Sequence, residues 1–302
     1  MKIVFLGTPD FSVPALDAII KAGHQVVGVV TMPDKPAGRG MQMQQSAVKK
    51  YAVENNIKVL QPVKLKDPAF IEELKSLDAD MQVVIAFRML PEIVWQMPKY
   101  GTLNLHASLL PDYRGAAPIN WAIINGETKS GVSTFFLKHE IDTGDVLLKT
   151  EVDITPTMNA GELHDLLMHI GAETVVKSLA LVESGNTKGS PQGSGSNKTA
   201  PKIFKENCLI HWDNKAEDIY NLIRGLSPYP AAFTHFENKI LKVFEAEVEL
   251  TKHTEPIGKF ISDNKMYLKV SCQNGFIRLL SIQLEGKKRM SIVEFLRGTK
   301  IN

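Results

Sequence analysis

Short apolar runs alternate with helical patterns through the first half of the chain. Strands of nearly unbroken apolar character are predicted at residues 2–7, 25–31, 57–62 and 81–87. The intervening residues 13–23, 45–56 and 67–77 repeat apolar positions at the helical spacing, and Asp67 stands where a helix N-cap is expected. Alternation of this kind is typical of a parallel sheet covered by helices on both faces.

The second half of the chain has a different pattern. Residues 159–185 predict one long amphipathic helix, and residues 185–202 are rich in Gly, Ser, Lys and Pro, as in a linker. A helix at 216–226 then precedes several short strand-like runs, which predict a small β-barrel. We therefore expect an α/β domain at 1–184, a basic Gly/Ser-rich linker at 185–205 and a barrel domain at 206–302.

Composition excludes several classes of protein. No apolar run reaches the roughly 18 residues that a membrane span needs, and the N-terminus lacks the layout of a signal peptide. The two cysteines, Cys208 and Cys272, belong to no CxxC or Cys/His cluster, which argues against a disulfide framework or a structural zinc site. We expect a cytoplasmic protein that needs no metal. No large apolar surface stripe is evident, so we also expect a monomer.

Charge is nearly balanced, at +2 overall, but it is unevenly distributed. The stretch between Gly185 and Lys205 carries four lysines and no acidic residue. This pattern permits a polyanionic partner.

One strand-like run carries polar residues where apolar ones are expected. Asn104 and His106 lie two apart in the sequence LNLHASLLPDYRG, so their side chains project from the same face of a strand. In parallel sheets, ligands gather at the carboxyl ends of strands, where this pair lies. An amide can stabilise an oxyanion and an imidazole can move a proton near neutral pH.

Asp142 completes a candidate constellation. It follows a strand in the sequence KHEIDTGDVLL, and we expect it at the carboxyl end of a strand adjacent to the one that bears Asn104 and His106. Its carboxylate either ties down the turn or orients the imidazole. Motifs for dinucleotide, ATP, zinc-protease and α/β-hydrolase chemistry are absent from the sequence.

These motifs together resemble a known family. The sequence NLHASLLPDYRGAAPINWAI followed by IDTGDVL is similar to the tetrahydrofolate-dependent formyltransferases. The stretches GTPDFSVPALDAI, VVTMPDKPAGRG, KIFKENCLIHWD, LSPYPAAF and GKKRMSIVEF resemble the branch of that superfamily that formylates methionyl-tRNA. The resemblance runs from end to end. It implies a Rossmann-like formyltransferase domain followed by an OB-like barrel that binds tRNA.

The resemblance also assigns residues. It implies catalytic roles for Asn104, His106 and Asp142, 10-formyltetrahydrofolate as formyl donor and initiator methionyl-tRNA as acceptor, in translation initiation. The expected folate-binding residues are Ser108, Leu109, Leu110, Pro111, Arg88, Met89 and Leu90. The expected tRNA-binding residues are Arg39, Lys198, Lys202, Lys205, Lys287 and Lys288.

Several alternatives remain open at this point. Phe87-Arg88 replaces a Tyr-Gly pair that is common in relatives, and Arg88 either touches the folate or points to solvent. Residues 41–48 also depart from the family pattern, and each of the lysines is either a phosphate contact or a solvated surface charge. A formyltetrahydrofolate hydrolase or a small-amine, sugar-nucleotide formyltransferase would use the same Asn/His/Asp site.

Overall fold

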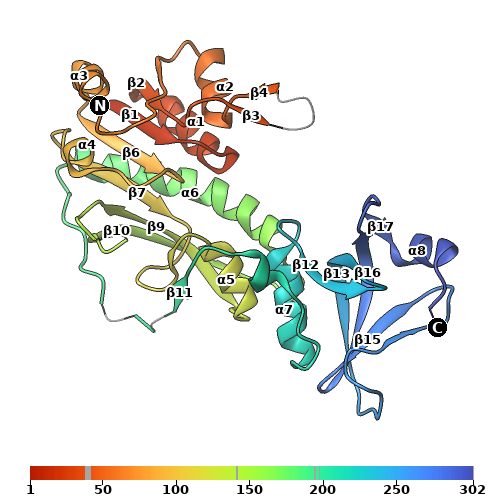
Figure 1. Ribbon diagram of the computed structural model, residues 1–302. Coiled ribbons are helices and arrows are strands. Elements are labelled where there is room, and N and C mark those ends of the chain that lie inside the picture. Colours follow the sequence, from red (N-terminus) through yellow and green to blue (C-terminus); the bar gives the residue numbers. More distant parts are fainter. Residues whose placement is uncertain (38–41, 141, 194, 197, 302) are drawn as a thin grey trace. The chain divides into compact units, whose positions relative to one another are not determined.

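The computed structural model describes residues 1–37, 42–140, 142–193, 195–196 and 198–301. It divides into two compact units (Figure 1). The first comprises residues 1–115, 131–152 and 164–198, and the second comprises residues 116–130, 153–163 and 199–302. The linear division at 185–205 stays a prediction. No helix in the described ranges is long and apolar enough to cross a membrane.

A seven-stranded sheet forms the centre of the first unit. Its strands, in spatial order, are β10 (Val146–Asp153), β9 (Lys129–Phe136), β7 (Thr102–His106), β6 (Met81–Ile85), β1 (Lys2–Gly7), β2 (Gln25–Val30) and β5 (Val59–Leu60). The five strands from β7 to β5 are parallel, so their carboxyl ends share one edge. Strand order reverses between β1 and β6, and ligands of open α/β sheets bind at such a switch point.

Helices and short elements connect these strands. They are η1 (Asp10–Ser12), α1 (Val13–Lys21), β3 (Lys35–Ala37), β4 (Gln42–Gln44), α2 (Ala47–Glu54), α3 (Pro68–Ser76), α4 (Glu92–Trp95), β8 (Arg114–Gly115), α5 (Pro118–Ile124) and α6 (Ala160–Glu183). The Asp67 carboxylate caps α3 by accepting a hydrogen bond from the Ala69 N–H at 3.0 Å, as predicted.

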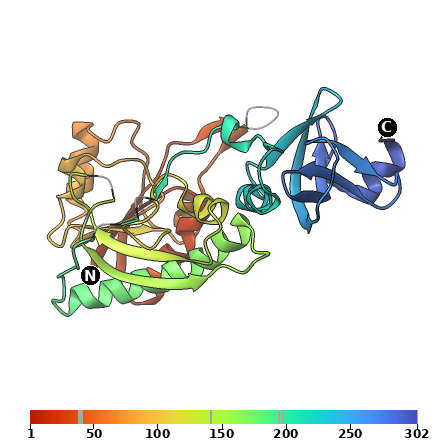
Figure 2. The same cartoon turned by 90° about the horizontal axis from the view of Figure 1, so that it is seen from below.

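The long helix α6 runs along one face of the sheet (Figures 1 and 2). Thr174 and Ser178 on this helix form hydrogen bonds with Thr150 of β10 and Thr134 of β9, both within 2.8 Å. Gly171 faces Leu105 so closely that a Cβ atom there would lie 2.7 Å from the leucine side chain. The helix thus fixes the position of the strand that carries the candidate catalytic residues.

One strand differs from the predicted all-parallel arrangement. β9 is antiparallel to β7, and Phe136 at its end pairs with Leu103 near the start of β7. Asp142 follows a strand adjacent to β7, as expected, but the carboxyl end of that strand lies at the opposite edge of the sheet from His106. The reason is that α5 between β7 and β9 belongs to the second unit and does not form a crossover on the sheet.

The second unit is built on a curled antiparallel sheet, half of a barrel. Its elements are β11 (Thr199–Ala200), η2 (Lys205–Cys208), α7 (Ala216–Leu226), β12 (Ala232–Phe236), β13 (Lys239–Leu250), β14 (Phe260–Ser262), β15 (Leu268–Cys272), β16 (Gly275–Leu284), β17 (Met290–Ser291) and α8 (Ile292–Gly298). Ile219, Ile223 and Leu226 of α7 pack into the core of this sheet. The predicted fold class is confirmed for both units.

Candidate active site

Strand β7 delivers two polar side chains to the same face of the sheet. Leu103 and Leu105 are buried, whereas Asn104 is only half-buried between them. The Asn104 carboxamide makes no hydrogen bond to any residue that the structure describes. Its N–H donors are therefore available to a substrate. His106 ends the strand and is only 8 % exposed.

The hydrogen bond of His106 fixes the roles of its two ring nitrogens. Nε2 lies 2.9 Å from the carbonyl oxygen of Tyr113. A carbonyl oxygen only accepts, so Nε2 carries the hydrogen and donates it. In the neutral ring Nδ1 is then an unprotonated acceptor, and it lies 4.0 Å from Oδ2 of Asp142.

Asp142 is held in an unusual backbone conformation. Its φ of +55° lies in the left-handed region, which costs a non-glycine residue of order 1 kcal/mol or more. Its Oδ2 accepts a hydrogen bond from the Gly115 N–H at 3.2 Å. Gly144 packs so tightly that a Cβ there would lie 1.8 Å from the Phe136 carbonyl oxygen. The loop between β9 and β10 therefore brings the carboxylate back to His106.

Two of the four residues in the predicted folate segment 108–111 are buried in the protein interior. Ser108 is 1 % exposed and donates a hydrogen bond to the Asp112 carbonyl at 2.7 Å, and Leu110 is fully buried. Ser133 donates to the Ser108 carbonyl and accepts from the Leu110 N–H. Leu109 and Pro111 are half-buried. Ser108 and Leu110 thus stabilise the turn that follows His106.

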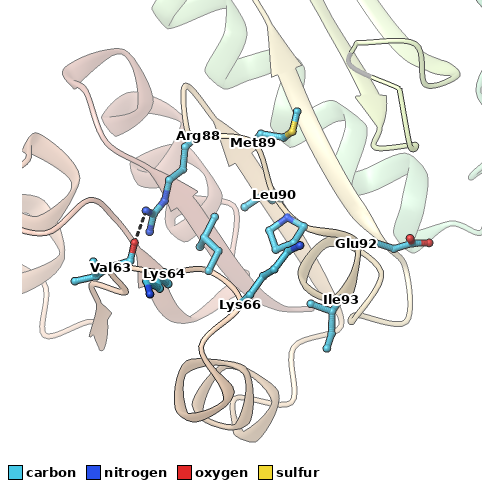
Figure 3. A pocket seen from close by; sticks show the side chains of 10 residues that line it. Val63, Lys64, Lys66, Arg88, Met89, Leu90, Glu92 and Ile93 are labelled. Carbon is cyan, nitrogen blue, oxygen red and sulfur yellow. Dashed lines mark hydrogen bonds between the residues drawn. The ribbon is translucent and has the colours of Figure 1, made fainter.

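A cavity of about 880 Å³ opens at the edge of the sheet formed by the carboxyl ends of the parallel strands (Figure 3). It is lined by Val63, Lys64, Leu65, Lys66, Arg88, Met89, Leu90, Pro91, Glu92 and Ile93. These two segments follow the carboxyl ends of the parallel strands β5 and β6. Because β6 pairs with β7, the cavity shares its edge of the sheet with His106.

Arg88 lines the cavity without pointing freely to solvent, and its contact with the folate stays a prediction. Its guanidinium donates to the carbonyl oxygens of Pro62 and Val63, the latter at 2.8 Å (Figure 3). Burial lowers the pKa of Arg88. The side chain therefore ties the two lining segments together, while Met89 is 72 % exposed at the cavity and Leu90 is buried.

The predicted tRNA-binding lysines all lie on the surface. In the first unit, Lys198 is exposed, with its ammonium 6.0 Å from the centre of the Tyr113 ring. In the second unit, Lys202 and Lys205 are exposed on either side of Phe204, and Lys287 and Lys288 are exposed after β16. Arg39 lies outside the described residues.

Several residues around the site were missed by the sequence reasoning. Tyr113, Gly115 and Gly144 act through backbone atoms. Such contacts cannot be inferred from the type of the residue. Arg114 and Gln192 meet through two hydrogen bonds of 3.1 and 2.5 Å to one glutamine oxygen. Gln192 lies in a stretch with the composition of a linker, where no catalytic-site residue is expected from the sequence. For the segment Val63 to Lys66, the only sequence feature that could have indicated a binding site is the pair Lys64 and Lys66 after a short strand.

Comparison with known proteins identifies the family. A model of the formyl transferase family matches residues 1–179, and a model of the formyl transferase C-terminal domain matches residues 202–300. A protein of Flavobacterium johnsoniae named methionyl-tRNA formyltransferase is 54 % identical over 99 % of this chain and 96 % of its own length. A protein of the same name from Bacteroides fragilis is 50 % identical over 99 % of this chain and 95 % of its own. This chain belongs to the methionyl-tRNA formyltransferase family.

Solved structures agree with this membership at the level of the fold. A Helicobacter canadensis N-formyltransferase, in complex with folinic acid and dTDP-3-aminofucose, aligns with a TM-score of 0.70. It is 20 % identical over 96 % of this chain and 100 % of its own. A methionyl-tRNA formyltransferase from Clostridium thermocellum aligns with a TM-score of 0.56, 18 % identity and coverage of 82 % and 94 %. The resemblance inferred from the motifs is confirmed, and the chain is an enzyme of the formyltransferase class.

Proposed function

We propose that this enzyme transfers the formyl group of 10-formyltetrahydrofolate to the α-amino group of initiator methionyl-tRNA. The observation that carries the proposal is the arrangement of Asn104, His106 and Asp142 at one edge of the sheet. An available carboxamide lies on the same strand face as an imidazole whose Nδ1 faces a carboxylate.

The reaction forms one C–N bond and breaks another. The neutral amine of methionine attacks the formyl carbon, and the bond from that carbon to N10 of the folate then breaks. A free α-amine has a pKa of about 8, so a useful fraction is already unprotonated near neutral pH. The chemistry therefore needs an oxyanion donor and a path for one proton from the attacking nitrogen to N10.

Asn104 is suited to the oxyanion. Its side-chain N–H groups are available, and the residue is half-buried in the middle of strand β7. A donor of this kind, placed against developing negative charge, is typically worth about 3 kcal/mol of barrier.

His106 is suited to carry the proton. Its Nδ1 accepts from the attacking amine, and the resulting imidazolium then donates to N10 as the folate leaves. The 4.0 Å between Nδ1 and the Asp142 carboxylate exceeds a hydrogen bond, and one bridging water would close this gap. The negative charge of Asp142 stabilises the imidazolium, and such acid–base catalysis contributes about 10²–10⁴ in rate.

The cavity at the same edge of the sheet as His106 is the proposed folate site. Its apolar lining by Leu65, Leu90 and Ile93 suits an aromatic ring system, and its volume falls in the range of small-molecule sites. Lys64 and Lys66 supply positive charge at the same cavity for an anionic donor. Met89 contributes exposed apolar surface there.

The second unit and its exposed lysines are the proposed tRNA-binding part. Lys202, Lys205, Lys287 and Lys288 would contact phosphates, as would Lys198 and Arg39. The high identity to relatives named for methionyl-tRNA supports this acceptor over a small amine. We further propose that the enzyme acts as a monomer in the cytoplasm.

The test is transfer of labelled formyl from 10-formyltetrahydrofolate to charged initiator methionyl-tRNA. Elongator methionyl-tRNA, free methionine, an amino-sugar nucleotide and buffer alone serve as parallel acceptors. Formylation confined to the initiator tRNA is the expected result. Folate turnover without any acceptor would indicate a hydrolase, and labelling of the sugar nucleotide would indicate a small-amine enzyme. Either result would overturn the proposal.

A further inference from the structure

The described residues of the segment 188–198, which are 188–193, 195–196 and 198, are attached to the first unit near the active site. Ser190 and Val146 exchange backbone hydrogen bonds of 2.8 and 2.9 Å. The Ser196 N–H donates to the Asp112 carboxylate at 2.7 Å, and the Lys198 carbonyl accepts from the Tyr113 N–H at 2.7 Å. A stretch with the composition of a linker is thus held at several points.

Gln192 lies between these anchors and joins both halves of the catalytic site. Its Nε2 donates to the carbonyl oxygens of Asp142 and Gly144, each at 2.8 Å. Its Oε1 accepts from Nε and Nη2 of Arg114 at 3.1 and 2.5 Å. The amide therefore makes four hydrogen bonds at once.

Both partners of Gln192 belong to segments that orient catalytic groups. Arg114 lies between Tyr113, whose carbonyl holds His106, and Gly115, whose N–H holds the Asp142 carboxylate. Asp142 itself has the left-handed backbone conformation, which persists only where its surroundings impose it. The glutamine connects the residues that hold His106 to the loop that carries Asp142.

We propose that Gln192 is a positioning residue that holds the Asp142 carboxylate against His106 during formyl transfer. The inference rests on the proposed function. Glutamine fits this position because the arginine side only donates and the carbonyl side only accepts. A glutamate would keep the arginine contact but place a negative oxygen against two carbonyl oxygens. An alanine would remove all four hydrogen bonds.

The experiment measures kcat and KM of the full-length chain and two variants, Gln192→Glu and Gln192→Ala, with 10-formyltetrahydrofolate and initiator methionyl-tRNA. We expect kcat to fall at least tenfold in both variants and both KM values to stay within twofold. Ser196→Ala is the matched control, because Ser196 is exposed on the same segment and holds Asp112 through its backbone N–H alone. Its kcat should equal that of the original chain.

A double-mutant cycle separates positioning from a general structural role. If Gln192 acts through Asp142, Gln192→Ala should cost less than twofold in kcat when Asp142 is already asparagine. An equal loss on both backgrounds, or kcat of Gln192→Glu within twofold of the original, would overturn the inference.

Arg114→Lys, which leaves the glutamine oxygen with one donor, gives an independent variant if Gln192→Ala does not fold. It should lower kcat in the same direction, and an unchanged kcat would contradict the inference. If the original chain formylates nothing, the proposed function fails and the inference falls with it.

Discussion

Nδ1 of His106 and Oδ2 of Asp142 face each other across 4.0 Å, while the other ring nitrogen of His106 is bound to the Tyr113 carbonyl. This relationship leaves a single imidazole nitrogen for proton transfer and places a negative charge beside it. The strand supplies the imidazole and a distant loop supplies the carboxylate, so the reactive geometry depends on how the loop is folded.

His106→Gln tests the proton carrier. Glutamine retains a donor for the Tyr113 carbonyl but cannot accept and return a proton. We expect kcat to fall by about 10²–10⁴ with little change in either KM. His169→Gln, on the exposed surface of α6, is the control and should retain full activity. A His106→Gln enzyme within threefold of the original rate would remove His106 from the mechanism.

Asn104→Asp tests the oxyanion donor. The carboxylate has the shape of the carboxamide but no N–H, and it repels the negative charge that develops on the formyl oxygen. We expect kcat to fall at least about 100-fold, which corresponds to the loss of a donor worth about 3 kcal/mol. Steady-state formylation assays would measure it, with Asn186→Asp on an exposed turn as the control. Retention of most of the rate would exclude this role.

Arg88→Lys tests the two-segment wall of the cavity. A lysine ammonium reaches one of the two carbonyl oxygens that the guanidinium holds, so the 62–66 segment loses one support. A lost hydrogen bond of about 1–1.5 kcal/mol predicts a KM for 10-formyltetrahydrofolate about tenfold higher, with kcat nearly unchanged. Arg297→Lys, exposed on α8, serves as the control. An unaltered KM would show that the cavity does not receive the folate.

Removal of surface lysines tests the tRNA contacts. The test variant replaces four lysines with alanine: Lys202, Lys205, Lys287 and Lys288. We expect KM for tRNA to rise. The slope of log KM against log salt concentration should decrease by about 3, because each phosphate contact contributes about 0.7–0.9 to that slope. The matched control replaces four exposed lysines of the first unit with alanine: Lys58, Lys75, Lys99 and Lys177. Equal salt slopes in the two variants would contradict the assignment.

Tyr51 predicts a pH dependence of stability. Burial and its hydrogen bond to Asp17 raise the pKa of Tyr51 to about 12. Since folding favours the protonated phenol, the contribution is complete below the unfolded pKa of about 10 and is lost as pH rises toward 12. The free energy of unfolding should therefore fall more steeply with pH in the original chain than in Tyr51→Phe. Urea titrations from pH 9 to pH 12 measure this difference, and parallel curves would refute it.

Sequence patterns predicted the framework because burial and local propensity act over short distances. The strand that carries Asn104 and His106, the Asp67 cap and helix α7 follow from spacing and residue type alone. The family motifs placed the catalytic candidates on this framework.

Other features depend on tertiary contacts that the local sequence does not encode. The antiparallel direction of β9 follows from the assignment of α5 to the second unit. Arg88 donates hydrogen bonds to two backbone carbonyls, and these belong to a segment about 25 residues earlier in the chain. The hydrogen bonds of Gln192 join residues about 50 and 78 positions away.

The second unit is built from three separate stretches of the chain, and this limits how the gene can be recombined in evolution. Asn120 donates to the Gly225 carbonyl and Arg224 to the Met158 carbonyl, so helix α7 is bound to two segments from much earlier in the gene. Ile124 packs onto the hydrophobic core of the same unit. A single genetic cut near residue 200 would strip these partners from the transplanted part. Gene fusion is therefore expected to carry the two units together, and exchange of the C-terminal unit alone to be selected against.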